Sequence, residues 1–299
     1  MSLCGKKEVR VMSKTVQISI IHYADEDELH CNDVLALLVK SIRELTEYPY
    51  ELNIIDNQMP PKAREDLDEK VPDVDILRNN TRSYSAGCNL AMRSFDTDYL
   101  VVLHTDLLVS WNWLTCAVKN LVDSEKHYGV PCVTTFRLLL YPMSLKLISW
   151  DMILENVVSP ETVISELDKW GFPWKTWNGI PIAISRPGLV TDHGWQIGVY
   201  MAGREFFDEV GPKEEALEAY EDLDYGLRAL ATRCRSLISE NVVLHHCGGL
   251  SALSGVWKGG GGRLNQPLID KFGEGILDKL LDGSIWLDLH KKQSEKYGK

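Results

Sequence analysis

Strand and helix patterns alternate along the first half of this chain, and this alternation limits the possible folds more than any other feature. Short β-branched or apolar runs predict strands, and apolar residues at helical spacing predict helices. The expected order is a strand at 16–21, a helix at 32–45 capped by Asn32 or Asp33, strands at 51–55 and 74–77, a helix at 89–95, a strand at 99–103 and a helix at 111–126. This order is typical of an α/β fold with a mainly parallel sheet.

Polar residues follow three of the predicted strands. His22 follows the first strand, Asp56 ends the second and Asp106 comes just after the fourth. Ligands of such sheets bind beyond the carboxyl ends of the strands, so these side chains are candidates for a site. Each of them taken alone is also an ordinary turn or cap residue.

The second half of the chain is less regular. It predicts a long helix at 214–233, a strand at 242–244 and a helical tail from residue 268. Acidic residues crowd the first turns of the long helix, where they suit the helix dipole. Within that cluster we expect Asp224 to pair with Arg228, four residues later.

Four tryptophans lie within 28 residues of this half, at positions 150, 170, 174 and 177. Such a cluster is either part of a hydrophobic core or a flat platform for a sugar ring.

Composition excludes several classes of protein. The 299 residues carry a formal net charge of −11, which argues against a protein that binds nucleic acid or an anionic membrane surface. Apolar runs stay below the roughly 18 residues of a spanning helix, and the N-terminus shows no hydrophobic signal core. Seven scattered cysteines without a C-x-x-C pair favour a reducing, cytoplasmic location.

Four segments in order carry a family resemblance. They are Tyr84–Asn89, Asp98–Asp106, Tyr220–Arg228 and His246–Ser251. Together they resemble the family 2 glycosyltransferases of the GT-A fold, and especially the galactofuranosyl- and rhamnosyltransferase-like branches. The resemblance covers about residues 16–251, and it implies a Rossmann-like mixed, mainly parallel sheet with helices on both faces, in one domain with a C-terminal helical tail.

The resemblance implies a binding site for a nucleotide-diphosphate sugar donor. Asp56 matches the acid that contacts the nucleobase. The remaining positions that match the donor site are His22, Tyr23, Arg82, Asn89, His104 and Thr105.

A metal motif is also implied. His104-Thr105-Asp106 matches the D-x-D motif with histidine in place of the first acid, so Asp106 keeps the metal role and that of His104 is open. His246 matches the third ligand, with His245 as its competitor. A carboxylate suits Mg²⁺ or Mn²⁺, and an added imidazole favours Mn²⁺.

The same resemblance assigns Asp222 as the catalytic base. Glu221, with Trp195, is expected to contact the acceptor. An acceptor hydroxyl is a weak nucleophile, so a carboxylate must take its proton.

The domain organisation follows from these assignments. Residues 1–14 are expected to be disordered and 15–251 to form the GT-A domain, with a nucleotide-sugar half at 15–128 and an acceptor half at 129–251. Residues 252–299 are expected to hold a flexible glycine-rich loop and C-terminal helices packed on the same domain. Within that loop, Lys258 and Arg263 flank a glycine run and are expected to reach the donor diphosphate when the loop closes.

The predicted function is metal-dependent, inverting transfer of a sugar to an acceptor hydroxyl on a glycan, glycolipid or other small acceptor. A lipid-linked acceptor would bring the protein to the inner face of a membrane as a peripheral protein. A nucleotidyltransferase is the first alternative, but it would need a basic glycine-rich loop after the first strand, where this chain is acidic. A non-catalytic carbohydrate- or nucleotide-binding relative is the second alternative, suggested only by His104.

Overall fold

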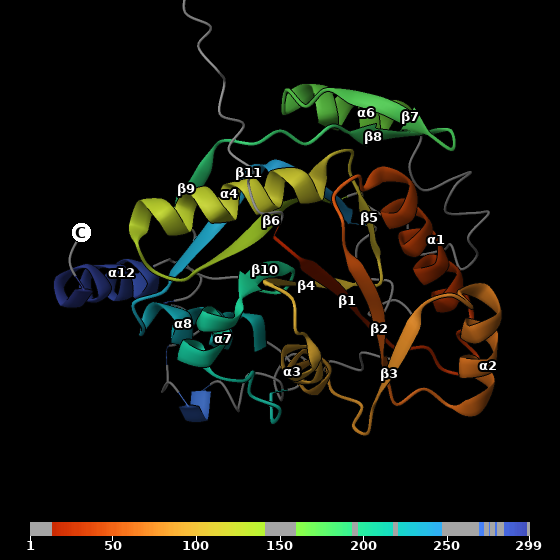
Figure 1. Ribbon diagram of the computed structural model, residues 1–299, viewed down its shortest axis with the longest axis horizontal. Coiled ribbons are helices and arrows are strands. Elements are labelled where there is room, and N and C mark those ends of the chain that lie inside the picture. Colours follow the sequence, from red (N-terminus) through yellow and green to blue (C-terminus); the bar gives the residue numbers. More distant parts are fainter. Residues whose placement is uncertain are drawn as a thin grey trace, which may run out of the picture.

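The structure is a computed structural model that describes residues 14–140, 160–192, 197–217, 221–246, 269–271, 275, 279 and 284–297. Figure 1 shows a central sheet with helices on both faces. The strands of this sheet are β1 (Val16–His22), β2 (Glu51–Asn57), β3 (Asp75–Asn79), β4 (Tyr99–His104), β5 (Leu107–Val109), β6 (Cys132–Leu140), β9 (Val190–Asp192), β10 (Tyr200–Gly203) and β11 (Arg235–His246). The helices are α1 (His30–Leu45), α2 (Pro61–Lys70), α3 (Tyr84–Ser94), α4 (Trp113–Tyr128), α6 (Pro160–Lys169), α7 (Arg204–Val210), α8 (Glu221–Leu230) and α12 (Ser284–Tyr297). A separate hairpin is formed by β7 (Trp174–Trp177) and β8 (Ile180–Ala183).

The sheet is mixed, and most of its described strands point the same way. Its order is β3-β2-β1-β4-β10-β6-β11-β5, with β9 also paired to β11. Strands β3, β2, β1 and β4 are mutually parallel, and β10 runs antiparallel between β4 and β6. Strand β11 is parallel to β6 and antiparallel to β5 and β9. The predicted mixed, mainly parallel α/β sheet is therefore confirmed.

Two hydrophobic cores lie on opposite faces of the sheet. Helices α1, α2 and α4 cover one core, and α3, α7 and α8 cover the other (Figure 1). Along β4, Val101 and Leu103 belong to the first core, while Leu100 and Val102 belong to the second. A strand covered on both faces needs apolar residues at successive positions, which is why β4 is a continuous apolar run.

In the first half of the chain, the predicted element order omits two elements: strand β5, between β4 and α4, and helix α2, between β2 and β3. This helix is strongly polar and buries only Ala63 and Leu67, so its apolar signal is too weak to read from sequence. Helix α1 begins at His30, and neither predicted cap residue caps it. The N-cap position is Leu29, without a side-chain cap, and Asn32 is buried within the first turn.

The predicted helix at 214–233 is also shorter in the structure. Gly211, with a φ of 80°, ends α7, and residues 211–217 form no helix. The helix that follows, α8, is described from Glu221 to Leu230. Strand β11 is much longer than the predicted 242–244 and shifts register between Ser239 and Val243.

Helix α3 begins five residues before the predicted start. The Ser83 hydroxyl accepts a hydrogen bond from the Ala86 backbone N–H, a standard N-terminal cap. Gly87 lies on the face of α3 that packs against β1 and β2. A Cβ there would stand 2.9 Å from Ile21 Cγ2 and 3.3 Å from Asn57 Oδ1, so this close contact requires glycine.

The tryptophan cluster divides between the core and the surface. Trp177 is buried and its Nε1 donates to Glu44 at 2.6 Å. Trp170 is 50% exposed, and the Arg137 guanidinium lies 4.8 Å from its ring centre. Trp150 lies outside the described residues.

Helix α12 packs against the end of α8 in the described C-terminal part. Gln293 Nε2 donates to the carbonyls of Thr232 and Cys234, at 2.9 and 2.7 Å. Among the described residues, no helix combines the length and apolar character needed to cross a membrane.

Candidate active site

Two histidines and one aspartate meet at the carboxyl edge of the sheet. His104 ends β4, Asp106 follows two residues later and His246 ends β11. One ligand atom from each lies within 4.8 Å of the others, and His246 Nε2 stands 3.2 Å from Asp106 Oδ2. Side chains this close, from segments 140 residues apart, form a candidate metal centre.

The pairing of β5 with β11 determines which histidine joins this cluster. His246 pairs with Leu107, the residue next to Asp106, while His245 pairs with Leu108. Because successive strand residues point to opposite faces, His245 is directed elsewhere. It is buried, and its Nε2 accepts the Ala183 backbone N–H at 3.1 Å.

The electrostatics of the cluster favour an anionic Asp106. Burial raises the pKa of Asp106, but the hydrogen bond from His246 and the electrostatic interactions with His246 and His104 hold it below the usual value. Burial lowers the pKa of His104, which keeps this imidazole neutral and able to ligate a metal. His246 Nδ1 is buried without a hydrogen-bond partner among the described residues, so this donor set has an unused ligand atom.

His22 is buried behind the metal motif and is fully hydrogen-bonded. Asn32 Nδ2 donates to the Ala63 carbonyl and to Asp66 Oδ2, which directs Asn32 Oδ1 toward His22 Nε2 at 2.7 Å. The Nε2 of His22 therefore carries the proton. Its Nδ1 accepts from the Thr105 hydroxyl at 2.9 Å, so His22 supports the centre of the metal motif from the end of β1.

Asp56 ends β2 as predicted, and protein groups occupy both of its oxygens. The Met59 backbone N–H donates to Oδ1 at 2.7 Å, and Arg64 Nε and Nη2 donate to Oδ2 at 2.9 and 2.5 Å. Arg64 comes from α2 and remains partly exposed. A nucleobase that approaches Asp56 would therefore meet a carboxylate already paired with a guanidinium.

Tyr23 and Arg82 form an open aromatic–cation pair near the same edge. The Arg82 guanidinium lies 3.8 Å from the Tyr23 ring centre. The Tyr23 hydroxyl donates to Asp25, and Asp25 also lies 3.8 Å from Arg82. Both predicted donor residues are thus together and accessible.

Asn89 is buried, and its side chain holds the segment between α7 and α8. Its Oδ1 accepts the Lys213 backbone N–H at 2.7 Å, and its Nδ2 donates to the Lys213 carbonyl and to Glu215. Within the described residues Asn89 therefore contacts protein at both ends of its amide.

The start of α8 brings Asp222 close to the histidine cluster. Asp222 Oδ1 accepts the Leu223 backbone N–H at 2.9 Å, and its carbonyl accepts from Ile197 N–H at 3.4 Å. A Cβ on Gly198 would lie 3.7 Å from the His104 ring and 3.9 Å from Asp222 Cβ. Glycine is thus the spacer between the predicted base and the metal motif.

Glu221 lies beside Asp222 and is half-buried. Burial raises the pKa of Glu221, with the Asp222 charge acting in the same direction and the Lys213 charge opposing it. A carboxyl group with a raised pKa accepts or shares protons nearer neutral pH. Glu221 therefore remains the rival of Asp222 for the role of base.

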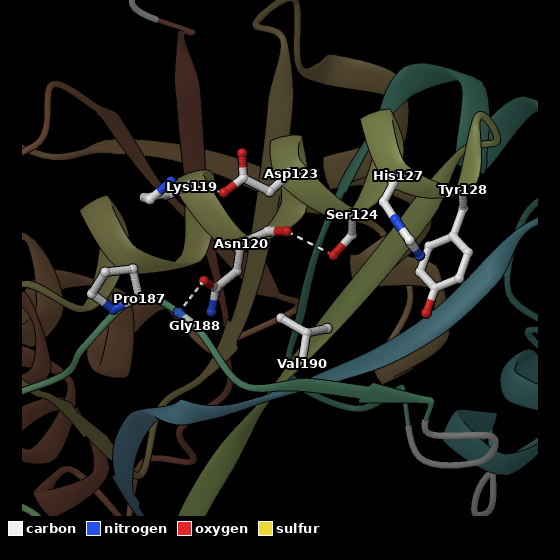
Figure 2. A pocket seen from close by; sticks show the side chains of 9 residues that line it. All are labelled: Lys119, Asn120, Asp123, Ser124, His127, Tyr128, Pro187, Gly188 and Val190. Carbon is white, nitrogen blue, oxygen red and sulfur yellow. Dashed lines mark hydrogen bonds and ion pairs between the residues drawn. The ribbon is translucent and has the colours of Figure 1, made fainter.

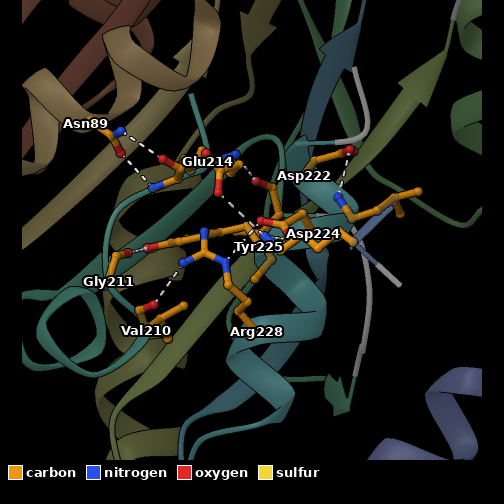
Figure 3. A network of polar contacts seen from close by, with 12 residues as sticks. Asn89, Val210, Gly211, Glu214, Asp222, Asp224, Tyr225 and Arg228 are labelled. Carbon is orange, nitrogen blue, oxygen red and sulfur yellow. Dashed lines mark hydrogen bonds and ion pairs between the residues drawn. The ribbon is translucent and has the colours of Figure 1, made fainter. Parts of the chain in front are cut away.

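Asp224 belongs to a structural network rather than to the open site. Arg228 Nε donates to its Oδ2 at 3.0 Å, as predicted, and Lys271 Nζ lies 2.6 Å from its Oδ1. Arg228 also donates to the Val210 carbonyl, so the network ties α8 to the end of α7 (Figure 3).

Three predicted site residues, Trp195, Lys258 and Arg263, lie outside the described residues. Conversely, sequence reasoning missed Asn32, Arg64 and Lys213. Asn32 looked like a helix cap, Arg64 lies on the helix that was not predicted, and Lys213 sits in a polar stretch typical of a surface turn.

A surface groove of about 400 Å³ lies elsewhere, between α4 and the β9 segment (Figure 2). Its lining includes Asn120 and His127, and none of its lining residues belongs to the histidine cluster or to the start of α8. Asn120 Oδ1 accepts from the Gly188 backbone N–H, so its amide joins the two walls.

A family model described as Glycosyl transferase family 2 matches residues 27–153. The resemblance read from the motifs is therefore confirmed over these residues. The two suggested branches remain predictions. No curated protein sequence matches the chain.

Solved structures share the fold at low sequence identity. TarS of S. aureus matches with a TM-score of 0.50 and 10% identity, covering 78% of this chain and 36% of that one. TarS 1-349 in complex with UDP-GlcNAc matches with a TM-score of 0.49 and 11% identity, covering 77% of this chain and 58% of that one. The mannosyltransferase PcManGT from Pyrobaculum calidifontis, in complex with GDP-Man and Mn²⁺, matches with a TM-score of 0.49 and 15% identity, covering 81% of this chain and 60% of that one. The chain thus spans between about a third and three fifths of these proteins, and the likeness to TarS confirms the GT-A fold.

Proposed function

We propose that this protein is a metal-dependent, inverting glycosyltransferase that moves a sugar from a nucleotide-diphosphate sugar to an acceptor hydroxyl. One observation carries the proposal: the edge of a family 2 domain brings a His-Asp-His cluster next to the carboxylates that begin α8. Metal ligands and a general base are the two elements that this transfer needs.

The residues of the cluster fit a divalent cation. One carboxylate with two imidazoles suits Mn²⁺ better than Mg²⁺, which prefers oxygen ligands alone. Asp106 and His246 would hold the ion, with His104 as a further ligand from the end of β4. A cation held there would neutralise the charge that develops on the departing diphosphate.

Asp222 is the proposed base. Its backbone carbonyl accepts from the Ile197 N–H and its Oδ1 accepts from the Leu223 N–H, so its carboxylate is held at the start of α8 beside the metal motif. From there it would take the proton of the acceptor hydroxyl as that oxygen attacks the sugar. A base on the face opposite the leaving group gives a single displacement with inversion.

The remaining contacts are assigned by position. Tyr23 and Arg82 offer an aromatic face and a cation for the nucleotide, while Lys258 and Arg263 are proposed to reach its diphosphate. Glu221 and Trp195 are proposed to contact the acceptor, a glycan, glycolipid or other small hydroxyl compound.

The test measures release of a nucleoside diphosphate from UDP- and GDP-sugars, with Mn²⁺, with Mg²⁺ and with a chelator. UDP-GlcNAc and GDP-Man are the first donors to try. We expect transfer that depends on the metal, and Asp222→Asn to lower kcat by roughly two orders of magnitude or more while donor binding persists. Asp123→Asn, at an exposed acid on α4, is the matched control.

Two outcomes would change the assignment. If Asp222→Asn turns over like the parent and Glu221→Gln is inactive, the base is Glu221. If no nucleoside diphosphate raises the melting temperature, with or without Mn²⁺, the protein is not a nucleotide-sugar enzyme.

A further inference from the structure

Lys213 is a lysine buried in the second core of the protein. It is 2% exposed, although lysine is almost never fully buried without a partner. Its backbone is clamped at both N–H and carbonyl by Asn89. The fold therefore fixes the position of Lys213. A buried ammonium group is unfavourable unless neighbouring groups stabilise its charge.

Three tyrosine rings surround the ammonium group. Its Nζ lies 5.5 Å from the ring centre of Tyr84, 5.5 Å from that of Tyr200 and 5.2 Å from that of Tyr225. These rings come from α3, β10 and α8, three elements of the second core. Aromatic faces attract a cation, so the cage stabilises the charge where water is excluded.

The ammonium group makes one hydrogen bond within the described part of the chain. Lys213 Nζ donates to the Ile197 carbonyl at 3.0 Å, and Tyr84 donates from its hydroxyl to the carbonyl of Gly198, the next residue, at 2.9 Å. These two bonds fix the backbone that separates His104 from Asp222. Tyr84 also packs edge-on against His104, with ring centres 5.1 Å apart.

We propose that Lys213 is a positioning residue for sugar transfer, which holds the Ile197–Gly198 backbone under the base and supplies the positive charge that balances the carboxylates at the start of α8. The proposal rests on the proposed function. The charge of Lys213 acts on Glu221, and Glu221 and Asp222 oppose each other as adjacent acids. One buried cation thus acts on Glu221 and on the backbone between the start of α8 and the metal motif.

The test compares Lys213→Met, which keeps the length and removes the charge, with Lys213→Arg, which keeps the charge and a donor. Lys119→Met, at an exposed lysine on α4, is the control. We expect Lys213→Met to lower kcat roughly 10- to 100-fold, with the donor KM and the affinity for Mn²⁺ changed less than about threefold. Lys213→Arg should recover part of the lost kcat.

A second measurement is independent of transfer. Melting temperatures of Lys213→Met are compared in the parent and in the Glu221→Gln background. If the Lys213 charge balances Glu221, the loss of melting temperature is smaller in the Glu221→Gln background.

The outcomes separate this proposal from the proposed function. Equal losses of melting temperature in the two backgrounds overturn the charge role, and a folded Lys213→Met protein with the kcat of the parent overturns the positioning role. If Lys213→Met lowers kcat, raises the donor KM and weakens Mn²⁺ binding together, Lys213 is a packing residue only, and the positioning role is overturned. If the parent transfers no sugar from any donor, the proposed function fails, and the comparison of melting temperatures alone decides for or against Lys213.

Discussion

His22 should make the stability of this protein depend on pH between neutral and mildly acidic conditions. Both of its ring nitrogens are hydrogen-bonded inside the protein, to Asn32 and Thr105. Burial lowers the pKa of His22 from 6.5 to about 4, against opposing contributions from Asn32 and Asp56. The perturbation to test is His22→Gln, which keeps a polar side chain and removes the titration.

The sign and size follow from linkage between protonation and folding. The unfolded chain binds a proton at His22 near pH 6.5, and the folded protein does so only near pH 4. The stabilising effect of a neutral His22 is therefore complete above pH 6.5 and is lost as the pH falls toward 4. The whole shift corresponds to about 3 kcal/mol, of which about 2 kcal/mol is lost between pH 7.5 and pH 5.

The assay is urea unfolding at pH 7.5 and pH 5.0 for the parent and for His22→Gln. His245, which burial also keeps neutral, is present in both proteins, so its contribution cancels in the comparison. We expect the parent to lose about 2 kcal/mol more than the variant over this range. Equal losses in the two proteins would refute the reasoning, because His22 would then titrate alike in the folded and unfolded chains.

Other predictions address the metal, the packing of α3 and the α8 network. His246→Ala should weaken Mn²⁺ binding by roughly tenfold or more in calorimetry, and unchanged binding would remove His246 from the site. Gly87→Ala should lower the free energy of unfolding by about 1–3 kcal/mol, because the added methyl overlaps Ile21; a neutral result in urea unfolding would show that α3 can move away. Asp224→Asn should destabilise by roughly 3 kcal/mol, since it leaves Arg228 and Lys271 without their shared anion, and a change well below 1 kcal/mol would contradict that role.

Much of the fold was predictable because its strands carry strong local signals. The apolar runs of β1 and β4 and the residues that end them are visible in the sequence. Helix α2 was not predictable, since it covers the sheet with only two buried side chains. The extent of β11 depends on pairing with β5, β6 and β9, which no local pattern reveals.

The site residues were predictable where a polar side chain lies at or just after the end of a strand. Asp106 and His246 were expected to share a metal, and the structure brings them together. The pairing of Asp56 with Arg64 was not predictable, because it needs the missed helix α2. The role of Lys213 was not predictable for a similar reason. Its cage combines Tyr84 on α3 with Tyr200 on β10 and Tyr225 on α8, which lie more than 100 residues further along the chain.

The placement of β5 has a consequence for how the protein is made. Strand β5 follows β4 directly in the chain, yet in the described sheet its pairing partner is β11, far along the sequence. Asp106 leaves the ribosome 140 residues before His246, which at 5–20 residues per second is a delay of roughly 7 to 28 s. During that interval the early half of the sheet can fold while the candidate metal cluster still lacks His246. The proposed sugar transfer would therefore begin only after β11 has been synthesised and has joined the sheet, and a nascent chain that stops earlier would lack part of the candidate site.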